Sequence, residues 1–403
     1  MLQGYIHPDF KTVGRLLKTQ MPRLRAGGAA LCVYHEGEKV IDTWGGTRNR
    51  EKEPWEEDTL ALSYSTTKGI ASTLLHILVD RNEVDYSEFI STYWPEFGDA
   101  DKEWITIRQA LCHETGLYDI RSMIDHARRI MDWEHMTNAL AQTKPTHMPG
   151  TAIGYHGITY GWLIGEIIQR VTGKSFAQVL KDELVDPLGL DGMYVGLPDS
   201  EMDRRAMLVN IETPPVVKKA MSFMEDVGMR QSSVALPKLF RRFGGGPQLL
   251  PQFMAALSPR GMHEIDFNSP ELVQACIPAA NGMFTARSLA KMYAMLANGG
   301  ELDGTRILSE KTVQKATRIQ SDRSGNVIPF SMQWRLGYHR VITLNNSIPN
   351  GFGHFGFGGS GAWADPERNL SLGLTLNSGV GTPFGDARIV NISTAVAWCA
   401  DRR

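Results

Sequence analysis

Cysteine is scarce in this chain of 403 residues. The four cysteines, Cys32, Cys112, Cys276 and Cys399, lie far apart and form no Cys-x-x-Cys pair. This spacing excludes a motif of paired cysteines. Because Cys32 and Cys112 have apolar neighbours in the sequence, we expect both to be buried free thiols.

Basic runs and long apolar runs are also missing. No run of lysine or arginine exceeds a pair, and the formal net charge is −2. Neither nucleic acid nor an anionic membrane surface is therefore indicated as the main partner. No apolar stretch approaches the length that spans a bilayer, and the first ten residues lack the basic and apolar segments of a signal peptide. We expect a cytoplasmic protein without a membrane span.

Strand patterns occur near both ends of the chain. Residues 28–35 predict a buried strand, and residues 39–46 return as its hairpin partner after a turn at 36–38. Three further strands are predicted near the C-terminus, at residues 333–338, 359–365 and 369–377. Helices are predicted at about residues 10–24 and 387–400.

The middle of the chain, from about residue 104 to residue 199, has a mostly helical pattern. The length suits one large core with an insertion. We therefore predict an α+β fold, in which an antiparallel β-sheet is built from both termini, is flanked by helices and carries an inserted helical domain. Residues 1–90 and 280–403 would form the sheet domain, and residues 91–279 the insertion.

Residues 201–262 are rich in proline, glycine and methionine and show no continuous period. One interpretation is an irregular surface insertion. The other is a lid or a wall of an acyl-binding site, since methionine adapts to varied apolar ligands. The sequence does not decide between them.

The most informative stretch is Ser65-x-x-Lys68, which precedes an apolar helical pattern. At the start of a helix this spacing places the hydroxyl and the amine on one face. The helix N-terminus adds free backbone N–H groups that favour an oxyanion. This arrangement is typical of an acyl-transfer nucleophile. A second copy, Ser288-x-x-Lys291, lies within an ordinary amphipathic helical pattern and is interpreted as structural.

Two other segments could complete such a site. Tyr155 lies on a loop flanked by glycine and proline, directly before a helical pattern. Beside a lysine ammonium its phenol would lose a proton more easily and could act as a general base, although a packed aromatic ring is the simpler alternative. The glycine-rich residues 353–361 could bring a backbone N–H close to a ligand as an oxyanion donor. They could equally form an edge loop with bulges.

Ser65-x-x-Lys68, Tyr155-His156-Gly157 and His354-Phe355-Gly356 follow one another in the order of three known motifs. In this order, and in the flanking residues 105–117, 281–286 and 298–304, the chain resembles the serine β-lactamase and penicillin-binding-protein superfamily, in its class C-like branch. The resemblance covers about residues 28–377. It implies the β-lactamase-like fold and neither a metal nor an organic cofactor.

The resemblance also implies roles for single residues. Ser65 would be the acylated nucleophile, and Lys68 and Tyr155 would share the proton transfer, with Tyr155 as the base. The N–H groups of Ser65 and Phe357 would form the oxyanion hole. His354, Phe355, Gly356 and Gly157 would belong to the substrate-binding and oxyanion region, in which Phe355 and Phe357 could either line the pocket or pack into the core.

Two positions depart from the pattern of the superfamily. Gly157 stands in place of an asparagine that contacts the acyl amide of the substrate. His354 stands in place of a lysine that binds the substrate carboxylate, and a histidine is mostly neutral near pH 7. Both changes favour neutral esters, and the pattern is similar to that of the family VIII carboxylesterases.

Other sites are less well supported by the sequence. Ser175 and Ser360 lack the complete Gly-x-Ser-x-Gly context of an α/β-hydrolase. His113-Glu114 lacks the second histidine of a zinc-binding helix, and His35, His76, His126 and His339 are interpreted as packing or surface residues.

The leading hypothesis is a carboxylesterase for small-molecule esters of short to medium acyl chain. An acyltransferase, a D-amino-acid amidase or peptidase, and a weak β-lactamase are alternatives on the same site. A binding or scaffold protein on an inactivated fold is the alternative without catalysis. The oligomeric state is left open.

Overall fold

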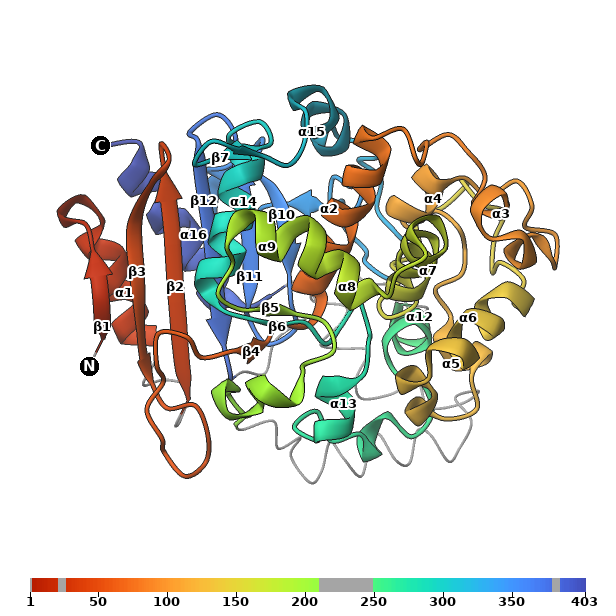
Figure 1. The fold of residues 1–403 in the computed structure, drawn as a ribbon, viewed down its shortest axis with the longest axis horizontal. Helices are drawn as coiled ribbons and strands as arrows, with labels where there is room; N and C mark the ends of the chain where they lie inside the picture. The colour runs from red at the N-terminus through yellow and green to blue at the C-terminus, as the bar shows by residue number, and fades with distance from the viewer. Residues whose placement is uncertain (1, 21–26, 210–248, 379–384) are drawn as a thin grey trace.

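The fold is built on a seven-stranded antiparallel sheet (Figure 1). The computed structural model describes residues 2–20, 27–209, 249–378 and 385–403. Strands from the two ends of the chain meet where β2 pairs with β12, so the sheet is built from both termini, as predicted. In spatial order the strands are β1 (Gln3–Ile6), β3 (Glu38–Gly46), β2 (Gly28–His35), β12 (Leu370–Leu376), β11 (Gly361–Asp365), β10 (Phe352–Phe355) and β9 (His339–Arg340).

One predicted strand is wrong. The backbone of residues 333–338 turns at Gln333 and Gly337, which have φ angles of 48° and 81°. Only an isolated bridge between Trp334 and Ser321 forms there. The apolar residues of this segment are buried in the core without being part of a strand. The nearest strand, β9, begins directly after the segment.

The alternation of side chains in β2 explains how helices cover both faces of the sheet. Leu31 and Val33 point into a cluster with α1 (Lys11–Gln20) and α16 (Ala387–Ala400). Ala30 and Cys32 point to the opposite face, toward α14 (Ala286–Ala297). Small residues are needed on that face because α14 lies close to the sheet: a Cβ atom on Gly373 would lie 2.4 Å from the carbonyl oxygen of Ala286.

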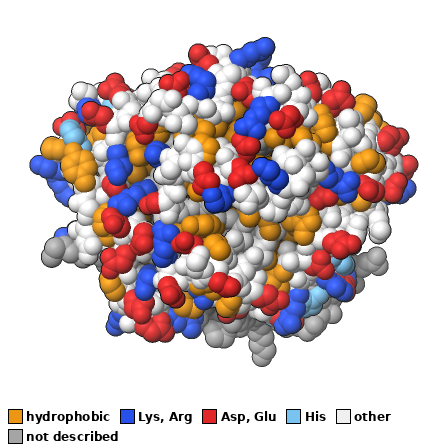
Figure 2. Space-filling model, viewed as in Figure 1, with side chains coloured by type: hydrophobic (Ala, Val, Ile, Leu, Met, Phe, Trp, Pro, Cys, Tyr) orange, Lys and Arg blue, Asp and Glu red, His pale blue; other side chains and the backbone are white. Residues whose placement is uncertain are grey.

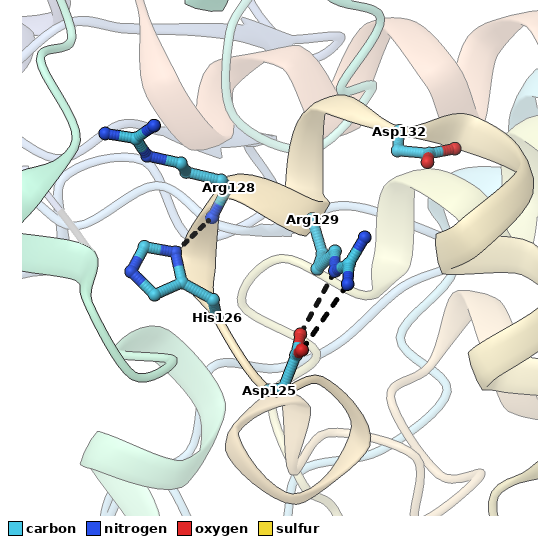
Figure 3. Close-up of a pocket in the computed structure, with 5 residues that line it drawn as sticks. All are labelled: Asp125, His126, Arg128, Arg129 and Asp132. Atoms are coloured by element: carbon cyan, nitrogen blue, oxygen red, sulfur yellow. Dashed lines mark hydrogen bonds and ion pairs between the residues drawn. The ribbon is translucent and has the colours of Figure 1, made fainter.

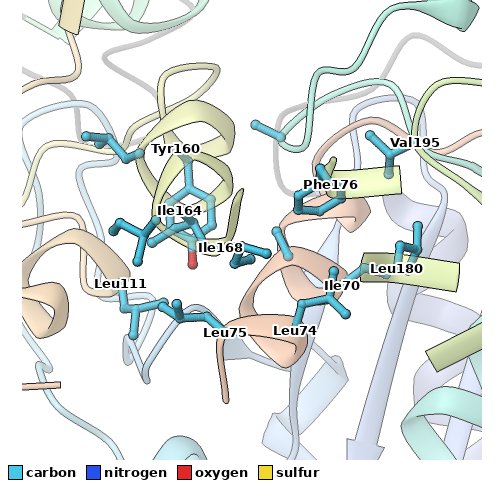
Figure 4. Packing of buried hydrophobic residues seen from close by; sticks show 14 of the residues in the cluster. Ile70, Leu74, Leu75, Leu111, Tyr160, Ile164, Ile168, Phe176, Leu180 and Val195 are labelled. Atoms are coloured by element: carbon cyan, nitrogen blue, oxygen red, sulfur yellow. The ribbon is translucent and has the colours of Figure 1, made fainter. Parts of the chain in front are cut away.

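Helix α2 (Thr67–Asp80) is the central element of the helical part, and every residue from Thr67 to Leu78 is buried. It packs against α7 (Tyr160–Thr172) through apolar contacts drawn in Figure 4. One apolar cluster runs from α2 through α7 to α14 and crosses the predicted boundaries at residues 90 and 280. The division into two domains therefore stays a prediction.

The remaining elements are short. The other helices are α3 (Ile90–Tyr93), α4 (Ile107–Leu111), α5 (Ile120–Met123), α6 (Trp133–Gln142), α8 (Phe176–Leu180), α9 (Asp186–Leu188), α12 (Leu249–Leu257), α13 (Pro270–Gln274) and α15 (Glu310–Thr317). Two small sheets join β4 (Ala61–Leu62), β6 (Met283–Phe284) and β5 (Met193–Tyr194), and β7 (Glu301–Leu302) and β8 (Thr305–Arg306).

Several further predictions concern single segments. The first long helix begins close to the predicted residue 10, since a 3-10 turn at Pro8–Phe10 leads into α1 at Lys11, and residues 21–24 lie outside the described residues. Most of residues 201–262 also lies outside them, so the lid stays a prediction.

Cys32 and Cys112 are buried and free, as predicted. In the described ranges no helix is long and apolar enough to cross a membrane.

The visible face of the molecule mixes basic and acidic side chains (Figure 2). Blue and red groups alternate across it, with apolar side chains scattered between them. Interspersed charges of both signs create little net field at a distance. This face therefore offers no basic surface of the kind that binds a polyanion.

Candidate active site

Ser65 lies in a short helical turn, η3 (Tyr64–Thr66), that leads directly into α2. The preceding residue, Tyr64, has a left-handed backbone with φ of 45°, which is unfavourable for a side chain of this size. Thr67 braces the turn, because its hydroxyl donates to the carbonyl of Tyr64 and accepts from the N–H of Gly282. The nucleophile candidate is thus held on a strained but braced turn.

Lys68 lies one helical turn beyond Ser65 and is fully buried. Its Nζ atom is 3.0 Å from Ser65 Oγ, 2.7 Å from the carbonyl oxygen of Gly157 and 2.9 Å from that of Ala279. None of these partners is a carboxylate. Burial lowers the pKa of Lys68 well below that of a free lysine. A neutral amine has two N–H donors and one lone pair, which match two carbonyls and one hydroxyl.

Tyr155 completes the contact with the serine. Its hydroxyl donates to Ser65 Oγ over 3.0 Å, and its ring is buried. Burial raises the pKa of this phenol, while the hydrogen bond to Ser65 opposes the shift. From the sequence, the neighbouring lysine is expected to lower this pKa. That expectation is wrong in direction, since desolvation disfavours both the ammonium and the phenolate.

Two histidines that the sequence analysis did not assign to the site hold the loop of Tyr155. The ring of His113 lies 4.9 Å from that of Tyr155, and His113 Nδ1 accepts the backbone N–H of His156. His156 contacts His113 through Nδ1 and Thr115 through Nε2. The carbonyl of His113 also accepts the N–H of Gly154. The only signals in the sequence were the position of His113 in the flanking segment 105–117 and that of His156 within the motif Tyr155-His156-Gly157.

A second loop supplies the other carbonyl partner of Lys68. Asn281 donates to the carbonyls of Leu272 and Ala275 and accepts the N–H of Ile277. These three hydrogen bonds fix the turn that carries Ala279. Residues 281–286, which resemble the superfamily in sequence, therefore have a structural role directly behind the site.

The end of β10 approaches the turn of Ser65 closely. A Cβ atom on Gly356 would lie 2.1 Å from the carbonyl oxygen of Ser63, so only glycine allows this approach. The backbone N–H groups of Ser65 and Phe357 have no acceptor among the described residues. Phe357 is half-buried, with its ring 5.6 Å from that of Tyr64. Phe355 is fully buried in the cluster under α16, so of the two alternatives it packs into the core.

His354 lies deep in the site rather than at its rim. Its ring stacks on Tyr155, with centroids 6.4 Å apart, and lies 4.6 Å from the ring of His339. Burial lowers the pKa of His354 well below that of a free histidine, and a positive charge on His339 or Lys68 would lower it further. Because Nδ1 contacts the carbonyl of Phe355, it carries the proton, and Nε2 has no partner within the described chain. His354 is therefore neutral and offers an acceptor.

Gly157 has no room for a side chain. A Cβ atom at this position would lie 2.2 Å from Leu257 Cδ2 and 2.8 Å from the carbonyl oxygen of Ala256. The space beside Gly157 is filled by α12. The glycine is thus required by its neighbours, whereas its contact with Lys68 is made by the backbone carbonyl, which any residue could supply.

The other serine candidates have structural partners. Ser360 is buried, and its hydroxyl accepts the N–H of Leu376 on the neighbouring sheet strand. Ser175 caps α8. Ser288 bonds to Asp191 and Thr285, while Lys291 faces Asp303, so the second Ser-x-x-Lys is part of an ordinary helix, as predicted.

A surface hollow of about 370 Å³ lies elsewhere (Figure 3). It is lined by Asp125, His126, Arg128, Arg129 and Asp132, none of which contacts the Ser65 cluster. Arg129 pairs with Asp125, which neutralises much of the local charge. In the part of the chain that the structure describes, no group of three or more His, Cys, Asp or Glu side chains could hold a metal ion.

Comparison with known proteins identifies the family of the chain. The family model described as Beta-lactamase matches residues 13–397. The chain belongs to the β-lactamase family. Esterase/beta-lactamase LipL of Mycobacterium tuberculosis (strain ATCC 25618 / H37Rv) is 34% identical over 379 residues, which are 93% of this chain and 82% of LipL.

Two solved structures of the family share the whole fold. The crystal structure of a family VIII carboxylesterase has a TM-score of 0.84 and 32% identity, and the match covers 99% of this chain and 100% of that one. A penicillin-binding protein homologue from Caulobacter crescentus has a TM-score of 0.83 and 32% identity, with the same coverage. This member of the β-lactamase family is a serine hydrolase with the α+β fold predicted from the sequence.

Proposed function

We propose that this serine hydrolase is a carboxylesterase that works through an acyl-enzyme on Ser65. The observation that carries the proposal is the position of Ser65 Oγ, 3.0 Å from Lys68 Nζ and 3.0 Å from the Tyr155 hydroxyl. A hydroxyl held between a buried amine and a buried phenol can lose its proton as it attacks a carbonyl. The names of the relatives, which include esterases, support the same reaction class.

Lys68 is the better proton acceptor of the two neighbours. Burial lowers its pKa and so favours the neutral amine, and both N–H groups are bound to carbonyls, which leaves the lone pair for the Ser65 hydroxyl. As the bond from Oγ to the ester carbon forms, the serine proton passes to Lys68. The bond to the alcohol then breaks, and Tyr155 gives its proton to the leaving alkoxide.

The second half of the reaction runs the same steps in reverse. Water attacks the acyl-enzyme carbonyl and gives its proton to the Tyr155 phenolate. The bond from the acyl carbon to Ser65 Oγ then breaks, and Oγ takes its proton back from the Lys68 ammonium as the acid leaves. In both halves the N–H groups of Ser65 and Phe357 would stabilise the oxyanion.

The substrate is proposed to be a neutral ester of short to medium acyl chain. A neutral, buried His354 supplies no cation for a carboxylate, and an unpaired carboxylate beside its lone pair would be costly. No side-chain amide is present at Gly157 to bind an acyl amide. These two residues favour esters over β-lactams and peptides.

Hydrolysis of p-nitrophenyl butyrate by wild-type protein and by Ser65→Ala tests the proposal. We expect the variant to lose at least about a thousandfold in kcat/KM, since nucleophile, base and acid act as a unit. Ser175→Ala is a matched control, because its hydroxyl only caps α8. A fluorophosphonate adduct mapped to Ser65 by mass spectrometry would give the same answer without turnover. Full activity in Ser65→Ala would refute the proposed function.

A further inference from the structure

Helix α12 lies directly against the loop of Gly157, whose carbonyl binds Lys68. Leu257, its last residue, reaches the space beside Gly157, where a Cβ atom would be only 2.2 Å from Leu257 Cδ2. The carbonyl of Gly157 is 2.7 Å from Lys68 Nζ, and Lys68 Nζ is 3.0 Å from Ser65 Oγ. The methyl groups of Leu257 are therefore separated from the nucleophile by one glycine and one amine.

Leu257 is anchored on one side and open on the other. Its neighbour Ala256 is fully buried in the cluster that contains Tyr155, and Leu257 packs against that cluster while remaining half-buried. Phe253 lies one turn earlier on α12 and packs against the same cluster. The C-terminal end of the helix is fixed, because Arg121 donates to the carbonyl of Ser258 over 3.0 Å. The exposed part of Leu257 is thus held in place.

The chemistry of this wall is apolar. The carbonyl of Gly157 is occupied by Lys68, and Leu257 has neither a donor nor an acceptor in its side chain. A polar group placed against it would lose its hydrogen bonds to water without replacement. An aliphatic chain would gain from the contact.

We propose that Leu257 is a specificity-determining residue that forms a wall of the acyl site and sets the length of aliphatic acyl chain the enzyme prefers. The inference rests on the proposed function. The acyl group stays bonded to Ser65 Oγ in both halves of the reaction, whereas the alcohol leaves after the first. A wall that is linked to Ser65 through Gly157 and Lys68 would therefore act on the acyl chain throughout.

The test compares Leu257→Ala and Leu257→Phe on p-nitrophenyl acetate, butyrate and octanoate. We expect the alanine variant to raise the ratio of kcat/KM for octanoate to that for acetate about tenfold, and the phenylalanine variant to lower it by a similar factor. Leu16→Ala is the matched control, because Leu16 is a half-buried leucine that packs on the opposite side of the sheet. It should leave the ratio unchanged.

A second series varies the alcohol at constant acyl group, with ethyl, butyl and octyl acetate. The proposal would be overturned if the octanoate-to-acetate ratio of kcat/KM stayed at the wild-type value in both variants. It would also be overturned if kcat/KM shifted with chain length only in the alcohol series. The opposite directions expected for alanine and phenylalanine separate a change of pocket from a general loss of stability. If one variant fails to fold, the direction of the other still decides.

Failure of the proposed function has a different signature. In that case wild-type protein would be inactive on every ester, or Ser65→Ala would retain activity. Rates of labelling by fluorophosphonates with short and long alkyl chains then test the wall directly, because they need only the Ser65 hydroxyl. The inference would be overturned on this readout too if the ratio of the labelling rates with long and short alkyl chains were the same in wild type and in both Leu257 variants.

Discussion

Lys68 shows how burial alone can prepare a residue for catalysis. Its amine is fully enclosed and contacts two carbonyls and one hydroxyl. An ammonium in this position would have lost its water without gaining a carboxylate, so the neutral form is favoured. A residue that is a cation on most protein surfaces is thus suited to the role of base that we propose for it.

The pH dependence of the reaction should report this group. In the proposed mechanism Lys68 acts in its neutral form, so kcat/KM for a neutral ester should rise with pH through the lowered pKa of Lys68 and level off above it. The ascending limb is expected well below the pKa of a free lysine, which is about 10.4. Rates measured from pH 5 to pH 10 would check this. A limb centred near pH 10 would show that Lys68 is charged at neutral pH.

At the scale of elements, the edge strand β9 positions the end of β10. His339 Nδ1 contacts the carbonyl of Arg340, so Nε2 is free to accept the N–H of Phe355 over 2.9 Å. Phe355 lies two residues before the proposed oxyanion donor, Phe357. A further hydrogen bond from Arg388 holds the carbonyl of Gly358 on the other side of that donor.

Removal of this support should weaken catalysis more than binding. We expect His339→Ala to lower kcat by about tenfold to a hundredfold with a smaller change in KM, because a displaced oxyanion donor acts in the transition state. His339→Gln, whose side-chain oxygen can still accept a hydrogen bond, should retain more activity. Steady-state kinetics on p-nitrophenyl butyrate measure both. Equal losses in the two variants would assign His339 to packing alone.

Two elements show where the sequence was informative and where it was not. The hairpin of β2 and β3 carries its own turn and alternating pattern, so local signals were sufficient. Residues 333–338 have a similar apolar pattern, but Gln333 and Gly337 turn the chain so that Trp334 stacks on Tyr155. That contact joins residues 179 positions apart (334 − 155), and no local pattern contains it.

At the scale of the whole molecule, a set of buried neutral histidines makes the fold sensitive to acid. Burial lowers the pKa of His76 and His156 to about 3 and that of His339 to about 4. In the unfolded chain these groups titrate near their ordinary pKa of about 6.5. The unfolded state therefore binds protons in a range where the native state does not.

The free energy of unfolding should fall as the pH falls from about 6.5 toward 4. Each of the three histidines is expected to lower the free energy of unfolding by roughly 1 kcal/mol between pH 6 and pH 5. This loss is regained as the pH rises above about 6.5. Urea denaturation at pH 7, 6 and 5 measures the change. His76→Gln should reduce the slope, because it removes one titrating group at a position remote from Ser65. An unfolding free energy that is constant from pH 7 to pH 5 would contradict the expectation.

The sequence by itself determined the fold class and the residues at the centre of the site. Periodic apolar patterns and the spacing of Ser65 and Lys68 are local properties, and the order of three motifs placed Tyr155 and His354 beside them. The tertiary structure decided the rest, because burial and long-range packing do not follow from neighbours in the chain. It raised the pKa of Tyr155, turned Phe355 into the core, brought His113, His156 and His339 behind the site, and set Leu257 of α12 against Gly157.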